Sequence, residues 1–376
     1  MKTKTVYLDN AATTPIHKRV IAAMSESLAN DFGNASSSHS FGRNAKNSIE
    51  IARKNIAKHL NAAASEIIFT SGATEGNNWI LNAAIQDLHV QRIITAKTEH
   101  HAVLHAAQHI SKKFNIRIEY LNVDVNGQIK VADLVNLLHE NVPTLVSLMH
   151  VNNETGVVFD IETIARICKQ YNAFFHSDTV QSIGKYQYDL QKLPLDFLVA
   201  SAHKFHGPKG IGFVFFRKGL AINPIIVGGE QEKGLRAGTE AVHNIVGMST
   251  ALTICSEDFD QNITKITSLK KYCLEQLKII FPTLKCNGSE DTFFNILNVQ
   301  LPISDDKTAL LLFNLDMKGI AVSRGSACQS GSSKPSHVLA EMLNNDDLKK
   351  PSIRISFSTL NTFEDIDYLV NALKSI

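Results

Sequence analysis

An alternation of strand and helix patterns between Glu66 and Asp178 constrains the fold of this chain more than any other feature. Apolar runs of strand length alternate there with segments whose apolar residues recur at helical spacing. We expect strands at Glu66–Thr70, Arg92–Thr95, Arg117–Leu121, Thr144–His150 and Ala173–Asp178, and helices at Glu75–Leu88, Ala102–Phe114, Val131–Glu140 and Ile161–Tyr171. This rhythm predicts an α/β fold with a mostly parallel sheet covered by helices on both faces.

The next pair of apolar runs, Leu195–Ala200 and Ile211–Phe216, surrounds a short turn-rich segment that contains Lys204. The connection is too short for a parallel crossover, so we expect one antiparallel strand. A lysine in a loop is usually a solvated surface charge. At the mouth of two buried strands, however, a lysine can be desolvated, which lowers its pKa and makes the free amine a nucleophile for carbonyls. Such an amine can form a Schiff base with pyridoxal phosphate (PLP).

The segments before Glu66 and after Gly238 complete the large domain and add a second, smaller unit. We expect a short strand at Val6–Leu8, helices at His17–Leu28 and Asn44–His59, and a long ordered loop at Asp31–Arg43 between those helices. After Gly238 the pattern is helical to about Lys278, and a second strand–helix alternation runs to the C-terminus. The sequence therefore predicts a large domain over residues 16–253 and a small α/β domain made of residues 1–15 and 254–376.

Composition excludes some classes of function. The chain has 376 residues, 38 Lys and Arg against 36 Asp and Glu, and is 44% hydrophobic. This balance gives no argument for direct binding to nucleic acid or a membrane. We find no signal peptide and no apolar segment of membrane-spanning length. The five cysteines are an odd number without paired spacing, which indicates free thiols and a cytoplasmic, reducing setting.

Three stretches carry residues suited to a bound cofactor. Ile67–Asn78 ends a strand and opens a helix at Ala73 and Thr74, where backbone N–H groups can bind an anion, although an ordinary helix cap is also expected there. Asp178 ends a buried strand, where it can pair with a protonated pyridine nitrogen or simply cap a helix, and Gln181 follows at a spacing suited to a ring hydroxyl. His100 lies just beyond another strand and can stack on a flat ring.

The remaining histidines and the cysteines divide into ordinary and reactive candidates. His101, His105 and His109 share one helix face, and a solvated face is favoured over a zinc site because no acidic or cysteine ligand is near. The cysteines in helical patterns, together with Cys286, are expected to be inert; those in helices are Cys168, Cys255 and Cys273. Cys328 lies in a Gly/Ser segment near Arg324 and Lys334, a positive setting that favours a nucleophilic thiolate.

Ten stretches in order give the chain a specific family resemblance. They are YLDNAATTP, SSSHSFGR, IIFTSGATEGNN, TEHHAV, MHVNNETG, HSDTVQS, SAHKFHGPKG, RAGT, SRGSACQSG and SIRIS. With these the chain resembles a PLP-dependent cysteine desulfurase of the NifS/IscS type, in the first group of that family within the class V aminotransferase superfamily. The resemblance implies a fold type I PLP enzyme with a seven-stranded sheet, working as a homodimer that takes sulfur from L-cysteine and releases L-alanine. It also implies sulfur-acceptor proteins, such as an iron–sulfur scaffold, or a role in tRNA thiolation.

The resemblance also implies residue roles. Lys204 would bind PLP covalently and shuttle protons, His100 would stack on the ring, and Cys328 would accept sulfur as a persulfide. The other implied cofactor contacts are Asp178 at the pyridine nitrogen, Asn153 and Gln181 at the ring hydroxyl, and Ala73, Thr74, Ser201, His203 and a partner subunit's Thr239 at the phosphate. Arg354 would bind the substrate carboxylate, with Asn34 assisting. No resident metal is implied, although Cys328 can transiently bind an iron–sulfur cluster.

Departures from the family pattern and rival functions stay open at this stage. Ala35 stands where a proline is usual, and Phe357-Ser358 follows SIRIS where a glycine usually comes second. The alternative functions are a selenocysteine lyase, another class V aminotransferase, or a non-catalytic sulfur carrier or scaffold. Cys328 argues against a transaminase, which has no use for a loop thiol, and the presence of Lys204 and Asp178 argues against a scaffold.

Overall fold

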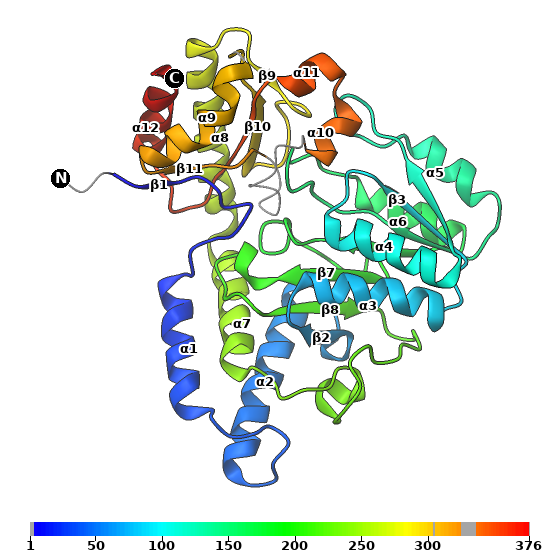
Figure 1. Ribbon diagram of the computed structural model, residues 1–376. Coiled ribbons are helices and arrows are strands. Elements are labelled where there is room, and N and C mark those ends of the chain that lie inside the picture. The colour runs from blue at the N-terminus through cyan, green and yellow to red at the C-terminus, as the bar shows by residue number, and fades with distance from the viewer. Residues whose placement is uncertain (1–3, 304, 325–335, 376) are drawn as a thin grey trace.

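The computed structural model describes residues 4–303, 305–324 and 336–375, and Figure 1 shows its arrangement. A seven-stranded sheet has the order β2-β8-β7-β6-β5-β3-β4. These strands are β2 Ile67–Thr70, β3 Arg92–Ala96, β4 Arg117–Leu121, β5 Thr144–Ser147, β6 Phe174–Asp178, β7 Phe197–Ser201 and β8 Gly212–Phe216. Strand β8 is antiparallel to both of its neighbours, whereas all other neighbouring pairs are parallel. The predicted mostly parallel sheet with one antiparallel strand is confirmed.

Helices cover both faces of this sheet because its strands are apolar on both sides. Side chains alternate along each strand, so Val199 of β7 packs with α3 and α4, while Leu198 and Ala200 belong to the core cluster on the opposite face. The first face carries α3 Ala73–Gln86 and α4 His101–Phe114. The opposite face carries α2 Ser40–His59, α5 Val131–Leu138, α6 Ile161–Gln170 and α7 Val242–Glu257, with α1 Lys18–Asn30 outside α7.

The predicted loop Asp31–Arg43 is wrong at its C-terminal end, because α2 already begins at Ser40. The His39 side chain accepts a hydrogen bond from the Gly42 N–H and caps the helix. Gly42 looks like a helix breaker in the sequence, but a Cβ at this position would lie 2.4 Å from the Ser37 carbonyl oxygen. The glycine is therefore needed where the loop passes close to the first turn of the helix.

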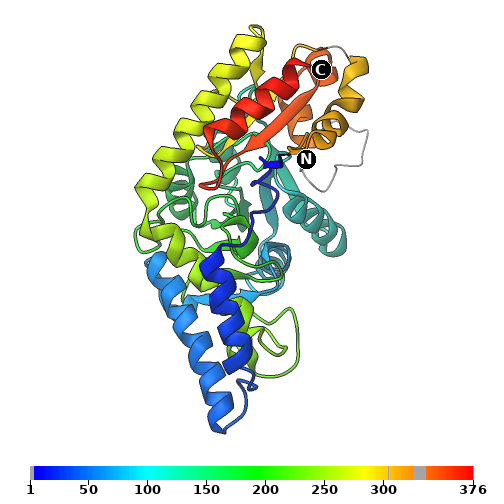
Figure 2. The same cartoon turned by 90° about the vertical axis from the view of Figure 1, so that its left-hand side faces the viewer.

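The smaller α/β unit lies above the sheet in Figure 1 and has its own core. Strand β10 pairs with β9 and β12, and β1 pairs in parallel with β11. Its elements are β1 Val6–Tyr7, α8 Phe259–Ile280, β9 Lys285–Cys286, β10 Ile296–Gln300, α9 Asp305–Met317, β11 Ile320–Ala321, α10 His337–Met342, α11 Asn345–Lys349, β12 Ser352–Ser356 and α12 Phe363–Lys374. Figure 2 shows α8 following α7 along one side of the molecule, which joins the two units.

Short 3₁₀ helices complete the described structure at η1 Ala64–Glu66, η2 Ala202–Lys204 and η3 Gln231–Gly234. None of the helices in the described ranges combines the length and the hydrophobicity that crossing a membrane requires. Of these short helices, η2 matters most for the site, because it places Lys204 directly beyond the end of β7.

Candidate active site

A cleft of about 480 Å³ lies at the edge of the sheet where its parallel strands end. Strands β2, β3, β5, β6 and β7 all point their carboxyl ends to this edge, which is where open α/β sheets bind ligands. Most residues that the sequence predicts for the site line this one cleft: Ala73, Thr74, His100, Asn153, Asp178, Gln181, Ser201, His203, Lys204 and Arg354. These residues come from segments that are far apart in the sequence: the start of α3, the residue before α4, the loop after β5, the ends of β6 and β7 with the turns that follow them, and β12.

Lys204 is held by the chain's N-terminal segment. Its Nζ donates hydrogen bonds to the Ala11 carbonyl at 2.6 Å and the Ala12 carbonyl at 2.8 Å. Burial, with the nearby positive charges of Arg354 and Lys185, lowers the pKa of Lys204 to about 7. The amine is therefore neutral in much of the protein at slightly alkaline pH, which is the form that attacks a carbonyl.

Asp178 and His100 face the cleft from neighbouring parts of the sheet. One Asp178 carboxylate oxygen accepts from the Asn77 amide at 2.8 Å, and the other accepts from the Val180 N–H at 3.1 Å. The side chain is only 7% exposed, and such a buried carboxylate can pair with a protonated ring nitrogen. His100 caps α4 by accepting the Ala102 N–H at its Nδ1, and burial lowers the pKa of its imidazole. A neutral flat ring at this position can stack on a cofactor.

The start of α3 lines one side of the cleft and is suited to bind an anion. Ala73 and Thr74 open this helix, so their backbone N–H groups have no partner in the preceding turn of the helix. Ser201 and His203 lie beside them, and burial lowers the pKa of His203 to about 4. Glu75 in the same turn is paired with Arg236 at 2.9 Å, which ties this helix start to the segment after η3.

Arg354 of β12 brings the small unit into the cleft. It is 1% exposed, donates to the Asn153 carbonyl at 2.7 Å and pairs with Asp9 at 2.8 Å. Its Nε has no hydrogen-bond partner among the described residues. A buried guanidinium with an unused donor beside Lys204 is suited to hold a substrate carboxylate.

Three sequence-predicted residues are not brought into this cleft. Cys328 lies outside the described residues. Thr239 is exposed and follows η3 without lining the cleft. Asn34 belongs to the loop between α1 and α2, which lies at the end of these helices that points away from the small unit in Figures 1 and 2. Its Oδ1 accepts the Ser36 N–H, so within one chain the structure does not place Asn34 beside Arg354.

The other four cysteines are poorly suited to act as reactive thiols. Burial raises the pKa of Cys255 and of Cys286 to about 11, and raises the pKa of Cys168 and Cys273 further. None of the four lines the cleft. They are therefore protonated packing residues at neutral pH, as the sequence predicted.

The histidine face of α4 is not a metal site in the described part of the chain. His101 stacks on His105 with ring centroids 4.7 Å apart and on His337 at 4.3 Å. The described residues contain no cluster of three or more His, Cys, Asp or Glu side chains that could hold a metal ion.

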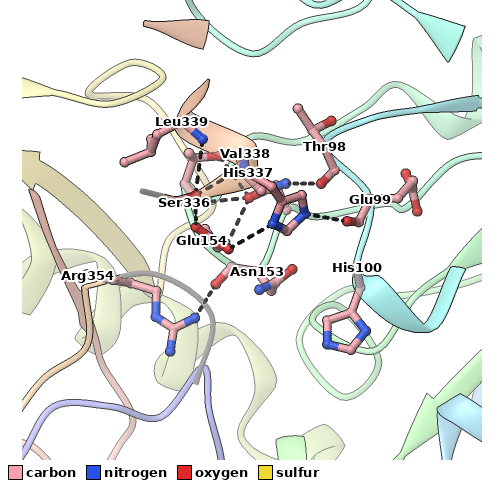
Figure 3. Close-up of polar contacts among 12 residues, drawn as sticks. Thr98, Glu99, His100, Asn153, Glu154, Ser336, His337, Val338, Leu339 and Arg354 are labelled. Carbon is pink, nitrogen blue, oxygen red and sulfur yellow. Dashed lines mark hydrogen bonds and ion pairs between the residues drawn. The ribbon is translucent and has the colours of Figure 1, made fainter. Parts of the chain in front are cut away.

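Sequence reasoning missed four polar residues in and around the cleft, of which Figure 3 shows Glu99 and Glu154. Asp9, Asn77, Glu99 and Glu154 all lie in stretches that carry the family resemblance, yet only the tertiary structure gives them partners. Glu99 accepts the Met149 N–H at 2.7 Å, and burial raises the pKa of its carboxyl well above its usual range. The positions of these residues within conspicuous motifs were the available signal.

The residues of the cleft fit PLP. The cofactor needs an amine that can be neutral, a carboxylate at the ring nitrogen, a flat neighbour and an anion site. Lys204, Asp178, His100 and the start of α3 supply these four in one cleft. The Gln181 side chain, 4% exposed, donates to the Ala11 carbonyl and keeps an Oε1 without a described partner, so it can also bind a ring hydroxyl.

Comparisons with known proteins agree on one family. The model of the family described as aminotransferase class-V matches residues 6–369. The chain is 41% identical to cysteine desulfurase IscS of Dictyoglomus turgidum over 374 residues, covering 99% of this chain and 94% of that protein. A solved structure of a NifS-like protein superposes with a TM-score of 0.90 at 36% identity, covering 99% of both chains. The structure of SspA in complex with cysteine is also similar, with a TM-score of 0.81, 30% identity, and coverage of 95% of this chain and 100% of that one.

Proposed function

This chain belongs to the aminotransferase class-V family and is a cysteine desulfurase, and we propose that the cleft around Lys204 binds PLP and L-cysteine for that reaction. The observation that carries the proposal is the convergence of Lys204, Asp178 and Arg354 on one cleft. When bound, PLP supplies an electron sink that lets the substrate lose its α-proton. Arg354 holds the substrate carboxylate, and Lys204 carries the proton.

The sulfur acceptor is proposed to be Cys328. Its thiolate attacks the sulfur of bound L-cysteine, so a sulfur–sulfur bond forms as the substrate carbon–sulfur bond breaks. The substrate carbon keeps the electron pair and takes up a proton, which gives L-alanine and a Cys328 persulfide. Support comes by elimination, because each of the other four cysteines has its pKa raised by burial. The persulfide then passes to an acceptor such as an iron–sulfur scaffold protein or the tRNA thiolation pathway, in the cytoplasm.

Incubation of the purified protein with PLP and L-cysteine tests this function. We expect L-alanine and protein-bound or reductant-released sulfur in equal amounts, because each alanine leaves one sulfur atom on the enzyme. An aminotransferase would instead need a 2-oxo acid and would release no sulfur. Strict dependence on L-selenocysteine would favour the selenocysteine lyase alternative.

We propose two domains, residues 16–253 and residues 1–15 with 254–376, and a homodimer in which Thr239 reaches a partner's phosphate site. The segment before Thr239 is anchored by a buried pair in which Arg53 donates to Glu232 at 2.7 and 2.8 Å. Thr239 itself is exposed, and the nearby Val227 side chain is 83% exposed. A segment that is anchored by a buried ion pair and carries an exposed apolar side chain is suited to pack on a second copy of the chain.

Thr239→Ala is expected to weaken PLP binding several-fold without unfolding the protein, because it removes one hydroxyl donor from the phosphate of the partner chain. Cofactor titration followed by absorbance measures the affinity, and sedimentation measures the assembly state. Thr253→Ala, which changes a threonine of α7 away from the cleft, is the matched control. A fully active monomer in sedimentation would reject the shared site.

A further inference from the structure

The start of α10, at Ser336 and His337, is fastened to the wall of the cleft by polar contacts from the small unit. The Ser336 hydroxyl donates to a Glu154 carboxylate oxygen at 2.5 Å and also caps α10 by accepting the Val338 and Leu339 N–H groups. The His337 Nε2 lies 2.9 Å from the Glu99 carbonyl oxygen. Figure 3 shows the His337 ring between Glu99 and Glu154, and the Ser336 side chain next to Glu154. Helix α10 has only 6 residues, so these contacts, rather than helix stability, must hold its start in place.

The His337 ring is held by one hydrogen bond and by ring stacking. A carbonyl oxygen can only accept, so the His337 Nε2 carries the proton that it donates to Glu99. The Nδ1 faces the second Glu154 oxygen at 4.0 Å, and one face of the ring stacks on His101. The Glu154 side chain is fully buried. The start of α10 is therefore held by the hydrogen bond that the His337 Nε2 donates and by the stacking of its ring on His101.

These contacts involve residues that are next in sequence to proposed cofactor contacts. Glu99 immediately precedes His100, and Glu154 immediately follows Asn153, whose carbonyl accepts a hydrogen bond from Arg354. The turn before His100 is also held by the Asn152 amide, which donates to the Thr98 carbonyl at 2.9 Å. Ser336 and His337 of the small unit therefore bind to this wall of the cleft, as do Arg354 and Asn298, which donate to the Asn153 and Glu154 carbonyls.

We propose that Ser336 and His337 are positioning residues that set where the cysteine-bearing stretch of the chain joins the cleft wall. Cys328 precedes Ser336 by eight residues in the sequence, which limits its separation from this anchor to at most about 28 Å for a fully extended chain. The contacts of Ser336 and His337 with Glu154 and Glu99 therefore fix the point on the cleft wall at which the cysteine-bearing stretch ends. The inference rests on the proposed role of Cys328 and adds a residue pair that acts through it.

His337→Ala and His337→Gln separate this role from mere packing. In the PLP-loaded enzyme, we expect His337→Ala to lower kcat for alanine release about ten- to hundred-fold, the scale expected when a reacting group is misplaced by about 1 Å. The KM for L-cysteine and the cofactor absorbance should stay near wild type, because Arg354, Lys204 and Asp178 are untouched. His337→Gln should recover most of kcat, because its amide can donate to the Glu99 carbonyl as Nε2 does.

His105→Ala is the matched control, since it removes a histidine from the same ring stack without a contact to Glu99 or Glu154. It should keep wild-type kcat. The inference is overturned if His337→Ala keeps kcat within two-fold, if His337→Gln is no better than His337→Ala, or if kcat falls only in proportion to lost cofactor or lost thermal stability. A wild-type protein that releases no alanine would instead reject the proposed function.

Discussion

Replacing Cys328 with serine is expected to lower alanine release from L-cysteine by several orders of magnitude, because the change removes the covalent nucleophile. Cofactor binding and loss of the substrate α-proton do not use this thiol, so the variant should keep the cofactor absorbance of the wild type. It should also still show the spectral change on adding L-cysteine. Alanine quantification in single-turnover and steady-state assays measures the loss, and mass spectrometry shows whether a persulfide forms.

The four other cysteines provide matched controls. Burial raises their thiol pKas, so Cys168→Ser, Cys255→Ser, Cys273→Ser and Cys286→Ser should keep most activity if the fold tolerates the hydroxyl. Cys255 and Cys286, which are only partly buried, are milder changes than the buried Cys168 and Cys273. Near-normal alanine release from Cys328→Ser would refute sulfur transfer to this residue and leave a generic PLP enzyme.

Lys204→Arg is expected to abolish covalent attachment of PLP and to lower turnover by several orders of magnitude. A guanidinium keeps the positive charge but cannot act as the amine nucleophile. After borohydride reduction of the wild-type protein, peptide mapping should find PLP on the peptide that contains Lys204. Lys209→Arg is the control, since Lys209 lines the same cleft but is exposed. A reduced adduct on Lys209 would contradict the assignment.

The pH dependence of PLP attachment tests the lowered pKa of Lys204. Burial, together with Arg354 and Lys185, lowers the pKa of Lys204 to about 7, so the reactive neutral amine increases as pH rises through about 7. An exposed lysine reaches the same fraction of neutral amine only at about pH 10. We therefore expect the rate of PLP attachment to cofactor-free protein to level off above about pH 8. A rate that still rises steeply between pH 8 and pH 10 would show that the amine is not desolvated.

Most of the secondary structure could be predicted because the strands are buried on both faces and the helices are strongly periodic. Strand Arg117–Leu121 is found with the predicted bounds. The α2 start was missed because a glycine required by close packing against Ser37 reads in sequence as a loop residue. The short strand β9 was missed because two residues give no period.

The candidate site likewise contains residues that could be predicted from the sequence and contacts that could not. Residues directly after a strand could be assigned to one edge from sequence, because parallel strands deliver their carboxyl ends together. Lys204, Asp178 and His100 are of this kind. The pairing of Ser336 with Glu154, and of His337 with the Glu99 carbonyl, joins positions about 180 and 240 residues apart, and nothing local in the sequence indicates that they meet.

The sequence by itself determined the fold class, the family and the chemical identity of the reactive groups, because each depends on local patterns and on which residue types are present. Only the tertiary structure decided the lowered pKa of Lys204, the partners of Arg354 and the anchoring of α10 beside His100. These properties depend on burial and on distances between groups from different parts of the chain. A local pattern carries the chemistry of a side chain, whereas its desolvation and its partners are set by the packing of the whole chain.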